Sequence, residues 1–198
     1  MTDSTARLLE PSIRYAMGVV LAVSPELLSR PTPCQEWDLR MLLRHACESL
    51  AALHEGTRAG RVGLAAAEED ADVAGDPARA FCISAGALLD TWTGQRDRPM
   101  VMDIAGCSLS GSLMASVAAL EMAVHGWDIS QACGRGEPIP PLLAVDLLLT
   151  AHLLVPADDR YPMFAAPVTI AATASPSDQL AAFLGRAPGY PLIVVGRS

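Results

Sequence analysis

Apolar residues recur three or four positions apart along most of the chain, which is the spacing of one face of an α-helix. The first such segment, residues 6–28, ends before Pro31 and Pro33, two residues that cannot continue a helix. The second begins after Asp38, a favourable N-cap residue, and its leucines recur up to about His54. The pattern therefore predicts two amphipathic helices joined by a stiff connection.

Three further helices are predicted after a connector rich in Gly, Ala, Glu and Asp, which we expect to be partly mobile. Asp76 supplies an N-cap, and Pro77 a proline at the first position of the next helix. The helix that stops at Gly134 is apolar on nearly every side, which is typical of a buried helix. The expected ranges are 56–76 for the connector, 77–94 for the third helix, 108–134 for the fourth with its serine cap, and 142–154 for the fifth, which Pro140 and Pro141 open.

Shorter segments are expected between and after these helices. Residues 100–104 should form a strand or an extended loop, and residues 168–172 a short strand. Residues 177–184 should form a short helix that ends at Gly185.

Composition places the chain among compact globular proteins. Apolar residues make up 51% of it and charged residues only 18%, which is far from the composition of disordered chains. A chain of 198 residues can bury a sizeable core as one domain. We therefore expect an all-α fold in a single domain, residues 1–198, with a core over about 5–155 and a short irregular C-terminal extension over 156–198.

Charge and hydropathy exclude several classes of partner. The net charge of −8 argues against nucleic acid, because binding to phosphates needs clustered positive charge. No apolar run reaches the ~18 residues of a membrane-spanning helix, and the N-terminus lacks the pattern of a secretory signal. We expect a cytoplasmic protein that has neither a nucleic-acid nor a membrane partner. The five cysteines are odd in number and include no C-x-x-C pair, so they are expected to be free thiols.

The strongest chemical signal is a carboxylate and an imidazole on the apolar fourth helix. Glu121 and His125 are four residues apart, so they project from the same face, which they share with Met114 and Ile129. A carboxylate buried on such a face needs a positive partner, because leaving it ionised and unpaired costs several kcal/mol or more. The chain contains no lysine, so this partner is either an arginine from another helix or a cation bound together with His125.

His45 on the second helix can complete a cation site with Glu121 and His125. Two histidines and one carboxylate from two packed helices form a common open site for zinc or iron. Each of the three residues also has a simpler interpretation that involves no metal. His125 can be a core histidine satisfied by a neighbouring carboxylate, His45 a half-exposed helix residue, and Glu121 the partner of Arg44 or another arginine.

Three segments resemble hallmark motifs of the actinobacterial DinB-like family that is related to the N-terminal domain of mycothiol-dependent maleylpyruvate isomerase. The resemblance spans almost the whole chain. The segments are Pro31-Thr32-Pro33-Cys34-Gln35-Glu36-Trp37-Asp38-Leu39-Arg40 with Leu42-Leu43-Arg44-His45, then Glu121-Met122-Ala123-Val124-His125-Gly126-Trp127-Asp128, and finally Ser175-Pro176-Ser177-Asp178-Gln179-Leu180 with Phe183-Leu184-Gly185-Arg186.

The resemblance implies a DinB-like four-helix bundle that binds a divalent metal. The implied ligands are His45, Glu121 and His125, and the implied metal is zinc, with nickel or iron as alternatives. In relatives of this family the metal serves chemistry that depends on a low-molecular-weight thiol such as mycothiol. The implied partners are therefore that thiol and a small electrophilic molecule, with a homodimer as a candidate assembly.

We expect a metal-dependent thiol S-transferase or isomerase that acts through a metal-bound thiolate. The alternative is a non-catalytic metal-binding sensor or interaction module. Because the chain ends at Ser198 without the second domain that accompanies the bundle in the isomerase, that enzyme's substrate is not carried over.

Residues around these motifs have expected supporting roles. Trp37 and Trp127 should pack near the site, and Asp128 should orient a ligand histidine. Cys34 is either a packed or capping residue or a thiol able to mimic or trap the thiol cofactor. Cys47 should point to another side of its helix, away from His45. His54 and His152 are expected to be surface or structural residues.

Overall fold

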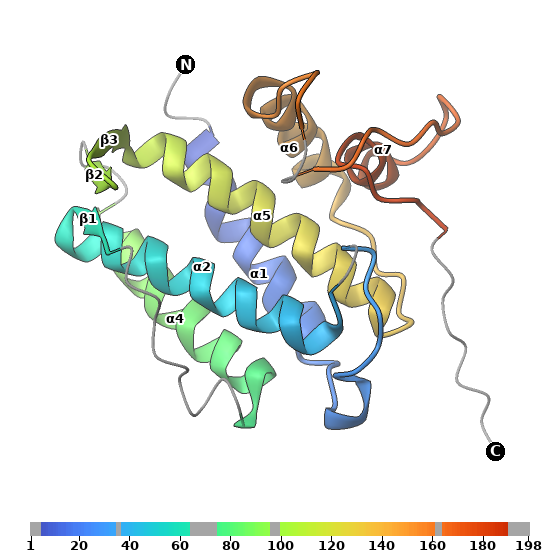
Figure 1. The fold of residues 1–198 in the computed structure, drawn as a ribbon, viewed down its shortest axis with the longest axis horizontal. Coiled ribbons are helices and arrows are strands. Elements are labelled where there is room, and N and C mark those ends of the chain that lie inside the picture. The colour runs from blue at the N-terminus through green and yellow to red at the C-terminus, as the bar shows by residue number, and fades with distance from the viewer. Residues whose placement is uncertain (1–4, 35–36, 64–74, 96–99, 161–163, 190–198) are drawn as a thin grey trace.

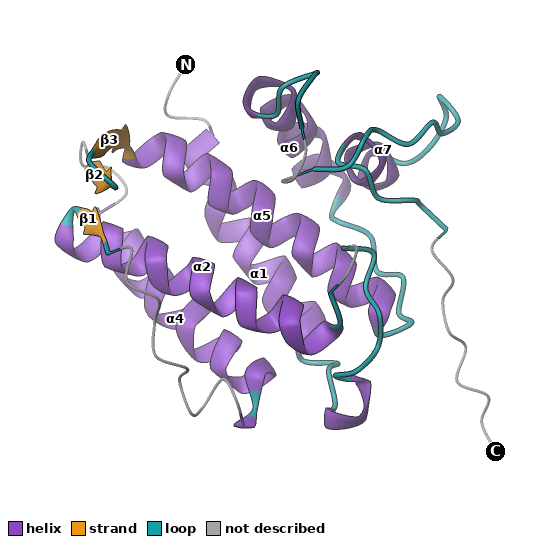
Figure 2. Ribbon diagram, in the orientation of Figure 1, coloured by secondary structure: helices purple, strands orange, loops and turns teal. Residues whose placement is uncertain are grey.

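The computed structural model describes residues 5–34, 37–63, 75–95, 100–160 and 164–189. Helices dominate this part of the chain, and one small sheet accompanies them (Figure 2). The all-α prediction is therefore confirmed in its main feature. Most of the expected connector, residues 64–74, lies outside the described residues.

Four long helices form the bundle: α1 (Leu9–Val20), α2 (Leu39–Ala59), α4 (Pro77–Gln95) and α5 (Gly111–Ala132). Helix α1 packs mainly against α5, and α2 packs mainly against α4. Contacts between α2 and α5 and between α1 and α4 join the two pairs (Figure 1). This arrangement puts α2 beside α5, and these are the two helices that carry the predicted metal ligands.

Helix α5 lies at the centre of the molecule because its surface is apolar or small on nearly every side. Its second half is buried from Met122 to Ala132 without interruption. Helix α1 comes close to it at Gly126, where an added Cβ would lie 3.0 Å from the Tyr15 ring and 3.2 Å from the Ala16 Cα. The prediction of a buried fourth helix is confirmed.

The C-terminal helices α6 (Pro141–Leu154) and α7 (Pro176–Phe183) pack on one another beside the bundle (Figure 1). Helix α6 also contacts α5 and the short 3-10 helix η1 (Thr5–Leu8). The Ser175 side chain caps α7 by accepting a hydrogen bond from the Asp178 backbone N–H at 3.1 Å. The C-terminal extension is therefore anchored to the bundle and contains a regular helix.

A three-stranded sheet closes one end of the bundle (Figure 2). Strand β1 (Arg61–Val62) pairs in parallel with β2 (Val101–Ile104), and β2 pairs in antiparallel with β3 (Cys107–Ser110). Met102 of β2 is fully buried and packs against α2 at Gly56, where an added Cβ would lie 2.8 Å from the Met102 sulfur. Since β1 follows α2 and β3 precedes α5, the sheet ties the ends of these two helices together.

Two boundaries differ from the sequence prediction. The first helix ends at Val20 instead of Leu28, and the shorter 3-10 helix η2 (Pro25–Leu27) follows it. The helix cannot continue to Leu28, because Pro25 disfavours the helical conformation at Ser24, which is extended with φ −114° and ψ 157°. Helix α2 runs beyond His54 and through Gly56 to Ala59, and it ends at Gly60, which adopts φ 69°.

The strand predictions had mixed outcomes. The expected strand or extended segment at 100–104 is confirmed as β2. The expected strand at 168–172 is wrong, because those residues form irregular structure and Val168 bonds to Ala182 of α7 instead of to another strand. The short strand β3 was not predicted, because its serines were interpreted only as helix caps. The cap prediction is confirmed at Ser110, which is the N-cap of α5.

A stripe of large apolar side chains on α6 faces outward. Leu142, Val145, Leu149 and Leu153 are exposed, whereas Leu147 on the opposite face is fully buried. Within the described residues, no helix combines the length and the apolar character needed to cross a membrane.

The two faces of α6 should respond differently to truncation of a leucine. Leu147→Ala removes a side chain with no exposed area and should lower the free energy of unfolding by about 2–5 kcal/mol. Leu149→Ala removes a side chain that is 63% exposed and should cost less than about 1 kcal/mol. Urea unfolding followed by circular dichroism measures both values, and equal losses would contradict this orientation of α6.

Candidate metal centre

The three predicted donor residues come from two adjacent helices. The side chain of Asp38 caps α2 by accepting a hydrogen bond from the Met41 backbone N–H at 2.8 Å, and His45 lies two turns further along. Glu121 and His125 lie one turn apart on α5, as the four-residue spacing predicts. Packing of α2 against α5 brings the three side chains to one point between the helices.

The donor atoms lie within metal-binding range of one another. One nitrogen of His45, one of His125 and one oxygen of Glu121 are mutually within 4.8 Å. His45 Nε2 is 2.8 Å from Glu121 Oε1, and the two histidine rings have centroids 5.3 Å apart. Ligands of one zinc ion at ~2.0–2.1 Å bond lengths lie about 3 Å or slightly more apart, so the group needs only small movements to close on a cation.

The Glu121 carboxylate is held in its ionised form. Burial raises its pKa, but the hydrogen bond to His45, the charge of His125 and the hydrogen bond from Ser49 together keep the pKa below its ordinary value. Ser49 donates to Glu121 Oε1 at 2.6 Å. An ionised carboxylate is the form that binds a metal ion, and a cation between Glu121 and His45 would take the place of the proton that they share.

His125 is oriented by a buried carboxylate on its other side. Asp128 is fully buried, and its Oδ2 lies 3.2 Å from His125 Nδ1. Burial alone raises the pKa of Asp128, but Arg186 and His125 hold it below its ordinary value. An ionised Asp128 accepts the Nδ1 proton, which leaves the lone pair of His125 on Nε2.

The arginine alternative for Glu121 is not supported. Arg44 forms an ion pair with Glu48, one turn further along α2, with Nε and Oε1 3.4 Å apart. Among the described residues, the side-chain partners that the structure gives Glu121 are His45 and Ser49.

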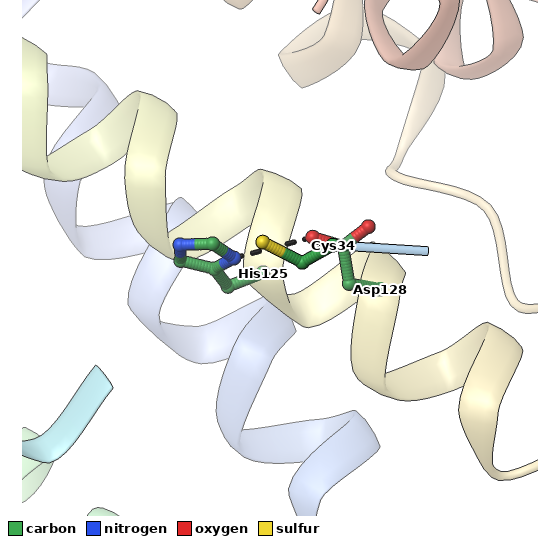
Figure 3. A group of neighbouring side chains, drawn as sticks. All are labelled: Cys34, His125 and Asp128. Atoms are coloured by element: carbon green, nitrogen blue, oxygen red, sulfur yellow. Dashed lines mark hydrogen bonds and ion pairs between the residues drawn. The ribbon is translucent and has the colours of Figure 1, made fainter. Parts of the chain in front are cut away.

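A second group of possible ligands shares His125 and contains Cys34 and Asp128, again with donor atoms within 4.8 Å (Figure 3). This group fits a cation less well. Burial raises the pKa of the Cys34 thiol, so the thiolate needed for binding is disfavoured. Both oxygens of Asp128 already accept hydrogen bonds from Arg186, whose positive charge would repel a cation at this point. The group of His45, Glu121 and His125 is therefore the better candidate.

The loop between α1 and α2 places an aromatic ring beside the site. Trp37 is half-buried, with its ring centroid 4.7 Å from that of His45 and 6.3 Å from that of His125. Thr32 holds this loop through its hydroxyl, which donates to the Trp37 carbonyl at 3.0 Å. Trp37 therefore packs near the site as predicted, while Trp127 is buried in the core.

Other residues singled out by sequence lie away from the donor group. His54 bonds to Thr91 and so bridges α2 and α4, and exposed His152 stacks on Phe183. Cys47 is buried, and its sulfur contacts the Pro77 carbonyl.

Arg186 was missed as a residue of this region, although its motif was recognised. Its guanidinium is buried and pairs with Asp128 across 58 positions of the sequence. The available signal was Asp128, seven residues after Glu121 on the same apolar helix. A second buried carboxylate requires a positive partner of its own.

The donor chemistry and access fit a divalent ion with open coordination positions. Two imidazoles and one carboxylate suit zinc, iron or nickel. The side chains of His45 and Glu121 are 36% and 26% exposed, so the group faces solvent on one side, while the His125 side chain is only 11% exposed. Such a site can admit a small ligand from solution.

Comparisons with known proteins give a family match and two relatives. The family model described as "Mycothiol maleylpyruvate isomerase N-terminal domain" matches residues 9–130, a range that contains all three donor residues. Two Mycobacterium tuberculosis proteins, uncharacterized protein MT0763 of strain CDC 1551 / Oshkosh and uncharacterized protein Rv0738 of strain ATCC 25618 / H37Rv, are each 28% identical to this chain over 174 residues. The alignment covers 86% of this chain and 92% of each relative. No solved structure matches the chain.

Asp128→Asn should destabilise the metal-free protein at neutral pH and less so in acid. Because the folded pKa of Asp128 lies below the usual aspartate value of about 4, the ionised carboxylate stabilises the fold fully above that pH. This contribution is lost as the pH falls through the lowered pKa. Urea unfolding at neutral pH and at about pH 3 in the presence of a chelator measures the effect. A difference between variant and wild type that does not shrink in acid would contradict it.

Proposed function

We propose that this chain, which belongs to the family of the mycothiol maleylpyruvate isomerase N-terminal domain, binds one divalent metal ion through His45, Glu121 and His125. We further propose that it uses the ion for thiol-dependent S-transfer or isomerisation of a small electrophile. The observation that carries the proposal is that these three donor residues meet between α2 and α5 at a position that is partly exposed to solvent.

The net charge of the proposed metal site supports a bound cation with one coordination position open to an exchangeable ligand. A divalent ion with one carboxylate and two neutral imidazoles has a net charge of +1. One anionic ligand neutralises this charge, and a thiolate of mycothiol or a related small thiol fits the requirement. When bound, the ion supplies Lewis-acid chemistry, which lowers the pKa of a thiol or water in its open position.

The residues around the donors have separate tasks in this proposal. Asp128 holds the Nδ1 proton of His125, so that Nε2 faces the donor group. Ser49 fixes Glu121 through its Oε1 atom. Trp37 covers the two histidine rings and limits the access of water to them.

The proposed chemistry balances without an oxidant or a reductant. In S-transfer, the thiol sulfur forms a bond to carbon, the leaving group departs with the bonding electron pair, and the thiol proton goes to solvent. In isomerisation, the sulfur adds to a carbon–carbon double bond and leaves again after rotation about the resulting single bond, so the thiol is regenerated.

The second candidate function is a metal-binding module without catalysis. The exposure of the donor group favours the enzyme, because purely structural zinc sites are closed by a fourth protein ligand.

The wild-type protein should contain about one divalent ion per chain, and His125→Ala should lose it. Elemental analysis of protein purified without a histidine tag and refilled with zinc measures the content. His152→Ala is the matched control, since His152 lies on α6 and stacks on Phe183 instead of facing the donor group. Absence of metal from the refilled wild type, or equal loss in the control, would overturn the assignment.

The zinc-loaded protein should accelerate the reaction of mycothiol with a small electrophile such as a haloarene or an epoxide. Glu121→Gln should return the rate toward the uncatalysed value, because it removes the only negative charge from the proposed ligands and weakens metal binding. Consumption of the free thiol measures the rate, with His152→Ala as the control. A protein that holds zinc but accelerates no such reaction would favour the non-catalytic module.

A further inference from the structure

Arg186 connects the C-terminal segment to the candidate metal centre. It lies well outside residues 9–130, the range of the family match. Its side chain is only 9% exposed and donates to both oxygens of Asp128, from Nη2 to Oδ2 at 3.0 Å and from Nε to Oδ1 at 3.4 Å. Asp128 in turn contacts His125 Nδ1, so three residues form a continuous buried chain that ends at a proposed metal ligand.

The backbone at the end of α7 directs Arg186 into the core. The Gly185 N–H bonds to the Ala182 carbonyl, and the Arg186 N–H bonds to the Ala181 carbonyl. These two bonds form the Schellman motif, in which a left-handed residue ends the helix and reverses the chain. Arg186 also donates from Nη1 to the Leu184 carbonyl at 3.0 Å, which fixes the plane of its guanidinium.

Gly185 is the residue that makes this reversal possible. It adopts φ 82°, which L side chains rarely adopt, and an added Cβ would lie 2.7 Å from the Cβ of Ala165. The turn therefore depends on glycine both for its conformation and for space. It places the guanidinium beside Asp128 at one defined position.

We propose that Arg186 is a positioning residue, which acts through Asp128 to hold His125 with its proton on Nδ1 and its lone pair on Nε2. The consequence is that the segment after α7 completes the metal centre. This consequence rests on the proposed metal-binding function. The physical reason is that a fixed guanidinium fork holds both carboxylate oxygens in one plane, and Asp128 then presents a single orientation to the imidazole.

Removal of Arg186 should affect His125 more than it affects the fold. Without the guanidinium, a fully buried Asp128 is left without its strongest positive partner. The carboxylate is then no longer fixed by the fork and can rotate away from the imidazole, so that it stops accepting the Nδ1 proton of His125. The imidazole is then free to populate its other tautomer, in which Nε2 carries the proton and cannot bind a metal.

Arg160 provides a matched control within the same segment. It is 7% exposed, nearly the same as Arg186 at 8%, and it donates to the Phe183 carbonyl at the end of α7. Its guanidinium lies 4.8 Å from the Phe183 ring centroid. Arg160→Met therefore removes a buried arginine that supports α7 but does not contact Asp128.

The first measurement is the tautomer of His125 in the metal-free protein, from nitrogen–proton correlation spectra of the imidazole at a pH near 8, where a free imidazole is neutral. The samples are wild type, Arg186→Met, Arg186→Lys and Arg160→Met, each treated with a chelator. We expect the Nδ1–H form in wild type and in Arg160→Met, and a mixture of tautomers in Arg186→Met. Arg186→Lys keeps the charge but not the fork, so it should give an intermediate result even if the methionine variant folds poorly.

The second measurement is Zn²⁺ affinity by competition with a chelating dye. We expect a loss of about 10–100-fold in Arg186→Met and no loss in Arg160→Met. A wild-type tautomer in Arg186→Met would overturn the inference, and so would an equal disturbance of His125 in Arg160→Met, because the effect would then be one of general stability. If wild type binds no zinc, the proposed function fails, while the tautomer of the metal-free protein still decides the role of Arg186.

Discussion

A fully buried carboxylate has to be matched by positive charge, and the pair of Asp128 and Arg186 meets that constraint here. Much of the molecule is arranged around it. Helix α5 is buried on all sides at Asp128, so the partner has to come from a separate segment, and α7 brings it there. The same carboxylate sets the direction of the His125 ring. One ion pair therefore joins the segment after α7 to the surroundings of His125.

Much of the fold and the proposed donor group could be predicted from sequence because the signals are local. The caps at Asp38 and Ser110 act within one turn, and the spacing of Glu121 and His125 fixes their common face once α5 is helical. His45 could be added because α2 has its own apolar stripe. The resemblance to the family is confirmed by the match over residues 9–130.

The parts that sequence did not predict depend on contacts between distant residues. The partner of Asp128 lies 58 positions away, and no spacing rule links Arg186 to it. Strands as short as β1 and β3 carry little periodic signal, because pairing with β2 stabilises them. The end of the first helix was misplaced because an apolar pattern continues past Val20, whereas the backbone restriction imposed by Pro25 at Ser24 prevents the helix from reaching Leu28.

The small sheet links the two helices that carry the proposed metal ligands. It joins the end of α2 to the start of α5, and His45 lies 14 residues from Ala59, or about 21 Å along the helix axis at 1.5 Å per residue. A shift of one residue in the pairing of β1 with β2 corresponds to about 3.3 Å along the strand. That displacement exceeds the 2.8 Å that separates His45 Nε2 from Glu121 Oε1. The strand register thus restrains the end of α2 relative to the start of α5, about four turns along α2 from His45.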